Sequence, residues 1–128
     1  LGSRKVAVLG LTFKRDTDDE RDSLSPKLIR LLERELADVA VSDPHAATPT
    51  QPLADALRDA DVVIVATNHS AFEGAATLRE VLALAADDCL IVDPWNCLGT
   101  TQVFLYAAEA RPMLEAPATL RARPDSTA

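Results

Sequence analysis

The sequence predicts an α/β protein built on a Rossmann-like open parallel sheet with helices on both faces. Short runs of Val, Ile, Leu and Ala alternate along the chain with segments of helical periodicity. The run Val62–Val65 is unbroken and apolar, which is typical of a strand covered on both faces. Strands separated by helices pair in parallel through right-handed crossovers, so the alternation predicts the sheet type as well as the fold class.

Four strands are expected in order. The first ends at Gly10, the second stops before a Pro, the third contains the unbroken apolar run, and the fourth follows a pair of acidic residues. Their expected ranges are Lys5–Leu9, Val39–Ser42, Asp61–Ala66 and Cys89–Val92.

Helices are expected between and after these strands. The first starts at Ser25-Pro26, with a hydroxyl cap and a proline in the first turn, and carries apolar residues at helical spacing. The last includes the run Val103–Tyr106, predicted to be partly buried on a helix. The expected ranges are Pro26–Leu36, Leu53–Arg58, Thr77–Ala85 and Gly99–Ala110. Residues 1–110 are thus predicted to form one domain, and residues 111–128, rich in Pro, Ala and Arg, a flexible tail.

Composition limits the function classes. The chain has 128 residues, 48% of them hydrophobic, which suffices for one core. A net charge of −7 argues against nucleic acid as a partner, because binding the phosphate backbone needs a cationic surface. No apolar run is long enough to cross a bilayer and no signal segment leads the chain, so neither a membrane nor export is expected. Two cysteines without metal-ligand spacing fit a reduced, cytoplasmic setting.

The long loop between the first strand and Pro26 is the candidate site. It carries cations and carboxylates, and in open α/β sheets ligands bind beyond the carboxyl ends of the strands. A solvated connection is the alternative. The loop lacks two of the three glycines of a dinucleotide fingerprint, so Asp43 after the second strand is interpreted as a turn residue rather than a ribose ligand. Arg21 stands where a calcium-binding loop needs glycine, which excludes that site and leaves no metal expected.

Four segments resemble motifs of the UDP-glucose/GDP-mannose dehydrogenase family. From Gly10 the chain reads G-L-T-F-K-R-D-T-D-D-E-R-D-S, similar to the G-x-x-F-K-x-x-T-x-D-x-R-x-S of that family's C-terminal, UDP-binding domain. Three further segments follow in family order: Ser42-Asp43-Pro44 resembles Y-D-P, Ala66-Thr67-Asn68-His69 with Phe72 resembles A-T-x-H/W-x-x-F, and Val92-Asp93-Pro94-Trp95-Asn96 resembles V-D-x-R-N.

The resemblance implies a part of an NAD-dependent nucleotide-sugar 6-dehydrogenase that oxidises a sugar C6 alcohol to a carboxylate. Phe13 and Lys14 match the pair that contacts the UDP-sugar, although Phe13 could equally pack into the core. Arg21 matches the arginine that reaches the NAD diphosphate, or it could only neutralise neighbouring carboxylates. NAD itself would be bound mainly by another domain. The implied partners are the UDP-sugar and the NAD-binding and central dimerisation domains of a homodimeric full-length enzyme.

Trp95 is the main departure from the family pattern, which has an arginine there that helps to hold the nucleotide-sugar. Loss of a charge-assisted hydrogen bond costs about 1.5–3 kcal/mol, whereas an indole could instead stack on a base or sugar. The family's catalytic cysteine motif is missing, and Cys89 and Cys97 are expected to be structural. His69 is expected to cap a short turn before Phe72. Two functions stay open: a substrate-binding part of the dehydrogenase, inactive alone, or a non-catalytic nucleotide-binding or regulatory module.

Overall fold

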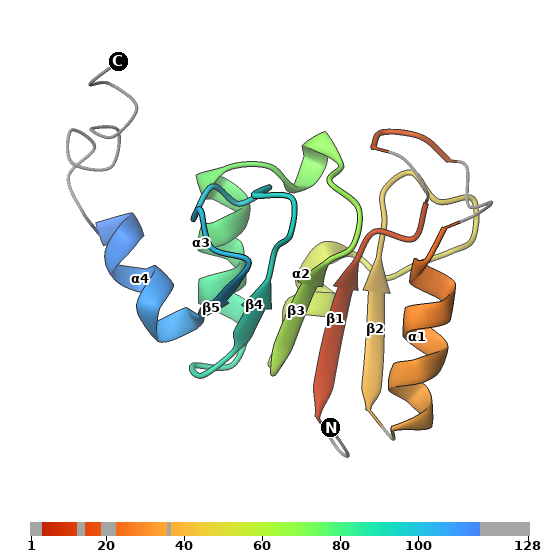
Figure 1. Cartoon of the computed structure of the whole chain (residues 1–128), viewed down its shortest axis with the longest axis horizontal. Helices are drawn as coiled ribbons and strands as arrows, with labels where there is room; N and C mark the ends of the chain where they lie inside the picture. Colours follow the sequence, from red (N-terminus) through yellow and green to blue (C-terminus); the bar gives the residue numbers. More distant parts are fainter. Residues whose placement is uncertain (1–3, 13–14, 19–22, 36, 116–128) are drawn as a thin grey trace.

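The computed structural model describes residues 4–12, 15–18, 23–35 and 37–115, and it is an open five-stranded sheet with the strand order β2-β1-β3-β4-β5 (Figure 1). Strands β1 to β4 pair in parallel, and β5 pairs antiparallel with β4. The strands are β1 (Lys5–Leu9), β2 (Asp38–Ser42), β3 (Val62–Val65), β4 (Leu90–Val92) and β5 (Phe104–Tyr106). The predicted fold class is confirmed, and the four expected strands lie within one residue of their predicted ends.

The helices divide between the two faces of the sheet. Helix α1 lies on one face beside β2, while α2, α3 and α4 pack on the other, and the 3-10 turn η1 follows β3 (Figure 1). Their bounds are α1 (Ser25–Arg34), α2 (Leu53–Leu57), η1 (Ser70–Phe72), α3 (Ala75–Leu84) and α4 (Ala107–Glu115). Among the described residues, no helix combines the length and apolar character needed to span a bilayer.

Successive apolar side chains of the strands point to alternate faces of the sheet and form a hydrophobic core on each face. Ala7, Val63, Ile91 and Leu105 are neighbours in the sheet register and face α2, α3 and α4, where none of them is more than 5% exposed. The next residues along each strand face α1, where Val6 and Val8 pack with Leu32 in a smaller cluster. Successive side chains of a strand point to opposite faces, so this pattern follows directly from the apolar runs.

The predicted helix Gly99–Ala110 is wrong over most of its length. Residues Phe104–Tyr106 form β5, and the helix begins only at Ala107. A bulky apolar run fits a half-buried strand as well as a helix face, and here Leu105 is buried while Phe104 and Tyr106 are exposed. This alternation of exposed and buried side chains has the period of two that is typical of a strand.

Two helix ends also differ from the prediction. The N-cap of α1 is Leu24 rather than Ser25, and its side chain offers no cap; instead Ser23 Oγ accepts a hydrogen bond of 3.2 Å from the Ser25 amide. Helix α4 continues to Glu115, so the chain is still helical for five residues beyond the predicted start of the tail at Arg111. Leu36 and residues 116–128 lie outside the described residues.

Candidate nucleotide site at the carboxyl edge

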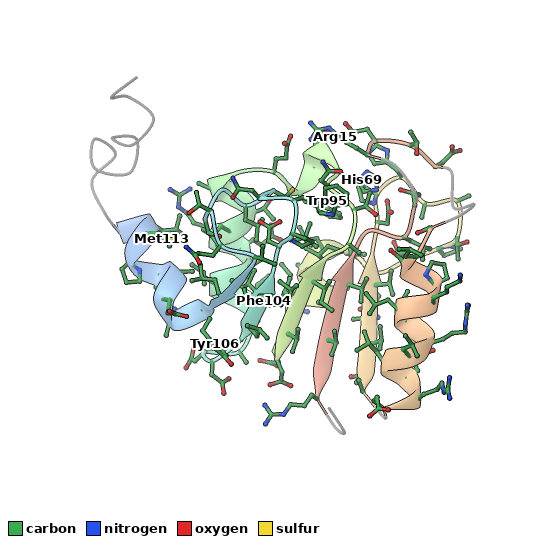
Figure 2. The ribbon with its side chains drawn as sticks, viewed as in Figure 1. Arg15, His69, Trp95, Phe104, Tyr106 and Met113 are labelled. Atoms are coloured by element: carbon green, nitrogen blue, oxygen red, sulfur yellow. The ribbon has the colours of Figure 1, made fainter. Side chains whose placement is uncertain are left out.

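The loops that follow β1, β2, β3 and β4 gather at the carboxyl edge of the sheet. Arg15, His69 and Trp95 come from three of these loops and lie together at this end of the molecule (Figure 2). A parallel sheet places the carboxyl ends of its strands at one edge, so residues far apart in sequence meet there.

The chain turns sharply at Gly10, directly after β1. Gly10 has φ +109°, and a Cβ built there would lie 2.5 Å from the Cβ of Thr67. Its amide donates to the Ser42 carbonyl, which joins the ends of β1 and β2. Only glycine permits both the left-handed φ and this approach to the loop after β3.

The side chain of Asp43, directly after β2, holds the start of the loop after β1 in place. Its buried carboxylate accepts hydrogen bonds from the amides of Leu11 at 2.6 Å and Thr12 at 3.0 Å, and from that of His45 at 2.7 Å. Burial alone would raise the pKa of this carboxyl, but these donors together with the His69 ring hold the pKa below its ordinary value. Asp43 is therefore an ionised hub of the site and more than the predicted turn residue.

His69 joins the loops after β1, β2 and β3. Its side chain is fully buried; Nδ1 accepts the Asp16 amide at 2.7 Å, and Nε2 lies 3.0 Å from both the Asp43 carboxylate and Thr12 Oγ1. A backbone N–H can only donate, so Nδ1 carries no proton and Nε2–H donates to Asp43. His69 is the N-cap residue of η1, as predicted, and its carbonyl accepts from the Phe72 amide, but its side chain makes no capping hydrogen bond to this turn.

The other side of the loop is tied to η1. Arg15 pairs bidentately with Glu73, at 2.9 and 2.8 Å, and also donates to the Asn68 carbonyl. The bond to Glu73 raises the pKa of Arg15, and it lowers that of Glu73. Asp16 accepts from the amide and hydroxyl of Ser70, and these bonds lower its pKa. Thr12 and Arg15, on either side of Phe13 and Lys14, are thus both anchored.

The turn after β4 presents Trp95. The buried Asp93 carboxylate accepts from the amides of Cys97 at 3.0 Å and Leu98 at 2.9 Å, which closes the turn. Trp95 is 54% exposed, and its Nε1 lies 3.4 Å from the Ala66 carbonyl. The indole therefore lies at the carboxyl edge with a large part of its surface open to solvent.

A hollow of about 390 Å³ separates Trp95 from the start of α1. Its lining is mostly apolar, with hydroxyl groups at Thr12, Ser23 and Ser25. The apolar lining includes Leu24, Leu28, Ile64, Ala66 and Pro94. A second hollow of about 410 Å³ lies beside Asp43 and Pro44, but the Asp43 oxygens there are already committed to backbone donors. The hollow at Trp95 is the better candidate site, because its lining includes both Thr12, next to Phe13, and Trp95.

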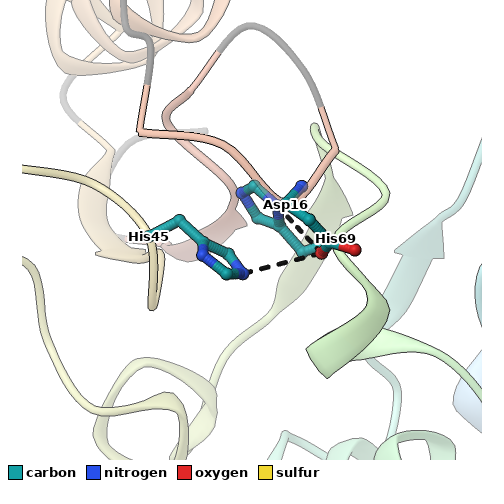
Figure 3. A group of neighbouring side chains, drawn as sticks. All are labelled: Asp16, His45 and His69. Atoms are coloured by element: carbon teal, nitrogen blue, oxygen red, sulfur yellow. Dashed lines mark hydrogen bonds and ion pairs between the residues drawn. The ribbon is translucent and has the colours of Figure 1, made fainter.

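Asp16, His45 and His69 form the one cluster of metal-ligating side chains found among the described residues (Figure 3). Their ligand atoms lie within 4.8 Å of one another. However, Nδ1 of His69 already accepts the Asp16 amide, and the Asp16 oxygens accept from Ser70. A cation would have to displace these bonds, so the group is better explained as a hydrogen-bonding network.

Cys89 and Cys97 are both buried. Burial raises the pKa of the Cys89 thiol to about 12 and that of Cys97 to about 11. A nucleophilic cysteine needs a lowered pKa, so both side chains have the properties of structural thiols.

The structure locates only part of the predicted site. Trp95 lines the hollow, whereas Phe13, Lys14 and Arg21 lie outside the described residues. The sequence reasoning missed the Asp43–His69 pair. The only signal in the sequence was their position near the ends of apolar strands, Asp43 directly after β2 and His69 four residues after β3, where a buried polar residue needs partners inside the fold.

The sequence matches the UDP binding domain of the UDP-glucose/GDP-mannose dehydrogenase family over residues 7–100. The chain therefore belongs to this family, and residues 7–100 correspond to the UDP-binding domain of nucleotide-sugar 6-dehydrogenases.

Individual relatives agree with the family. The chain is 32% identical over 68 residues to a UDP-N-acetyl-D-mannosamine dehydrogenase of Pyrococcus horikoshii. The matched segment covers 53% of this chain and 16% of that protein. The chain is also 40% identical over 82 residues to a UDP-glucose 6-dehydrogenase of Haloferax volcanii. This match covers 56% of the chain and 19% of that protein. The chain thus spans less than a fifth of the length of these relatives.

Solved structures show the same relation. The UDP-N-acetyl-mannosamine dehydrogenase of Staphylococcus aureus superposes with a TM-score of 0.66 at 28% identity, over 80% of this chain and 25% of that one. The Pyrococcus horikoshii dehydrogenase gives 0.67 at 25% identity, over 80% and 24%.

Proposed function

We propose that the hollow between Trp95 and the start of α1 receives the uridine part of a UDP-sugar. One observation carries this proposal: the only tryptophan of the chain is half exposed on the wall of an apolar slot at the carboxyl edge. A nucleobase has apolar faces and polar edges, which suits an indole and leucine side chains with hydroxyl groups around them.

Two residues outside the described part complete the proposed substrate site. Phe13 and Lys14 follow Thr12, which lines the hollow, and the family resemblance assigns them to the UDP-sugar. A lysine ammonium suits a diphosphate as a mobile point charge. Arg21 is proposed to reach the diphosphate of NAD, because a guanidinium can bind phosphate bidentately.

The chain is proposed to act as the substrate-binding part of an NAD-dependent dehydrogenase that oxidises the C6 alcohol of the sugar. NAD and the catalytic thiolate would come from NAD-binding and central dimerisation domains of a full-length, homodimeric cytoplasmic enzyme. The high pKa values of Cys89 and Cys97 support this division, because neither side chain is a thiolate at neutral pH. The pure chain is therefore expected to reduce no NAD with any UDP-sugar.

Trp95 also supports a second candidate function, a nucleotide-binding or regulatory module without turnover, because it replaces the family's substrate-binding arginine. Titration calorimetry with UDP at low salt tests binding for both functions. We expect weak binding that weakens further in Lys14→Ala and at higher salt, with Lys27→Ala, an exposed lysine on α1, as the matched control. Absence of heat with millimolar-range UDP would refute the site. Recovery of turnover when the chain is restored to its complete gene product would exclude the second function.

A further inference from the structure

One buried imidazole contacts the loop after β1 at two separate points. The side chain of His69 is fully buried. Its Nε2 lies 3.0 Å from Thr12 Oγ1, and its Nδ1 accepts the Asp16 amide at 2.7 Å. Thr12 also lines the hollow beside Trp95. A change in the His69 ring is therefore transmitted to the loop after β1 and to the wall of the candidate site.

The bond from Asp16 to His69 exists in only one protonation state of the ring. A backbone N–H always donates, so Nδ1 can accept it only while this nitrogen carries no proton. In a protonated imidazole both nitrogens donate, and the Nδ1–H would face the Asp16 N–H across 2.7 Å. Proton uptake by His69 and this contact therefore exclude each other.

The backbone of Asp16 is held in a strained conformation by its neighbours. Its φ is +57°, in the left-handed region that residues other than glycine rarely occupy. His69 holds its amide, and its carboxylate accepts from the Ser70 amide at 2.8 Å and from the Ser70 hydroxyl at 2.9 Å. Asp16 Oδ1 also lies 3.8 Å from Nδ1, so a charged ring would draw this oxygen away from Ser70. Protonation of His69 would thus remove one contact of Asp16 and weaken the other.

Apart from histidine, the charged and titratable side chains described around His69 do not change charge between about pH 5 and 8. The carboxyl groups with a pKa below the ordinary value are Asp43, Asp16 and Glu73. The pKa of Arg15 is raised, and burial raises the pKa of the Cys97 thiol, which lies 3.9 Å from the His69 carbonyl, to about 11. A histidine ordinarily changes charge in this range, so a pH effect on this contact points to a histidine.

The chain has one other histidine, His45, and its effect has the opposite sign. Asp16 pairs with both rings (Figure 3), and Nε2 of His45 lies 3.5 Å from Asp16 Oδ1. A proton on His45 would therefore strengthen the attachment of Asp16, whereas a proton on His69 breaks it. The two ring centroids are 4.6 Å apart, so two charged rings would also repel each other. Release of the loop at acid pH consequently identifies His69, and tighter holding identifies His45.

We propose that His69 is a positioning residue that holds the loop after β1 only as a neutral imidazole, and that a proton on His69 releases the loop at Asp16. The holding is present at neutral and alkaline pH and is lost as pH falls, because the released state binds the proton more tightly. Release should weaken the binding of a UDP-sugar at the carboxyl edge. This consequence rests on the function proposed above, whereas the release itself does not.

Nuclear magnetic resonance of the ligand-free chain tests the release. The ¹⁵N shifts of the His69 ring show which nitrogen carries a proton, and the Asp16 and Ser70 amides report on the loop. At pH 8 we expect Nδ1 to carry no proton. On acidification Nδ1 should gain one with the same midpoint at which the two amides shift, while the amides of β3 stay in place. A protonated Nδ1 at pH 8, a ring that stays neutral to pH 5, different midpoints, or simultaneous unfolding of β3 would overturn the inference.

Two substitutions separate the roles of the two ring nitrogens. His69→Asn places a carbonyl oxygen on Cγ, where Nδ1 is attached, and can accept from Asp16 without binding a proton. His69→Gln places an amide nitrogen near the position of Nε2, and so keeps a donor to Asp43 but loses the acceptor for Asp16. Calorimetry with UDP-glucose measures their effect on binding. This ligand is chosen over UDP because the terminal phosphate of UDP itself titrates near about pH 6.

The three proteins should show three different pH profiles. The parent should bind UDP-glucose roughly tenfold more weakly at pH 5 than at pH 8, about the effect of losing one hydrogen bond. His69→Asn should bind at both pH values about as tightly as the parent does at pH 8. His69→Gln should bind at both as weakly as the parent does at pH 5.

His45→Gln is the matched control and should keep the loss of affinity on acidification. Loss of the pH dependence in His45→Gln, or its persistence in His69→Asn, would contradict the role of His69. If the variants at position 69 do not fold, the resonances of the parent chain still decide. UDP-glucose that binds at neither pH would refute the proposed function and leave the release of Asp16 to be decided by the ligand-free spectra.

Discussion

The Asp43 carboxylate lies 3.0 Å from Nε2 of His69, and both side chains are fully buried. This pair connects the loop after β2 with the loop after β3, and each residue also binds the loop after β1 through backbone amides. Leu11, Thr12 and Asp16 of the loop after β1 are thereby held by the loops after β2 and β3. A preorganised loop loses less conformational freedom on ligand binding, which is the expected benefit of this arrangement.

Asp43→Asn should destabilise the domain by about 2–3 kcal/mol, because an amide cannot accept from all the donors around it. The pKa of Asp43 is lowered in the folded state, so its contribution is complete above the ordinary value of 3.8 and is lost as pH falls below it. Urea unfolding from neutral to acid pH measures this. The variant should show a weaker acid dependence than the parent.

The matched control for that change is Asp87→Asn, since the Asp87 side chain is fully exposed. It should leave both the stability and its pH dependence close to those of the parent protein. If the two variants behaved alike, Asp43 would not be the hub described above.

Gly10→Ala should cost about 3 kcal/mol, because it adds strain at a positive φ and a collision with Thr67. Gly99→Ala provides the comparison: φ is +79° there, but a Cβ would meet nothing within 4 Å, so only about 1 kcal/mol is expected. Denaturant unfolding of the two variants separates the collision from the strain. Equal losses would show that Thr67 moves aside at no cost.

Cys97 should react slowly with iodoacetamide in the folded protein. Its pKa of about 11, against an ordinary 9.0, reduces the thiolate about a hundredfold at neutral pH. Mass spectrometry should show little alkylation of the native chain and rapid alkylation after unfolding. Rapid alkylation of native Cys97 at neutral pH would instead indicate an activated nucleophile.

Relative to Trp95→Leu, Trp95→Arg should tighten UDP binding roughly tenfold to a hundredfold, because it introduces a charge-assisted hydrogen bond of about 1.5–3 kcal/mol. Calorimetry at low and high salt measures this, and the gain should shrink as salt rises. Trp95→Leu controls for loss of the indole and should weaken binding. A Trp95→Arg variant that binds no better than Trp95→Leu would show that the turn after β4 does not face the diphosphate.

Strands were predictable from the sequence because each buried run is continuous and has a Gly or an acidic residue at one of its borders. Val62–Val65 and Lys5–Leu9 are examples. The run at 103–106 was not predictable by the same reasoning, because a run of four apolar residues fits either period. Its strand character depends on pairing with β4, which is a tertiary contact.

For the candidate site, the sequence predicted which loops form it but not the contacts between their side chains. The position of Trp95 at the carboxyl edge follows from the strand that precedes it. In contrast, the pairing of Asp43 with His69 joins residues 26 positions apart through no local pattern. Only the order of β1, β2 and β3 in the sheet brings them together.

Tryptophan fluorescence tests the central claim most directly, because Trp95 is the only tryptophan and stands on the wall of the proposed uridine site. Titration of the chain with UDP at low salt should change the emission along a saturable curve, with a half-point that rises with salt and in Lys14→Ala. Inorganic diphosphate alone should give a smaller change, because it lacks the base that stacks on the indole. An emission that stays constant while UDP binds elsewhere, or while no UDP binds, would contradict the assignment of this hollow.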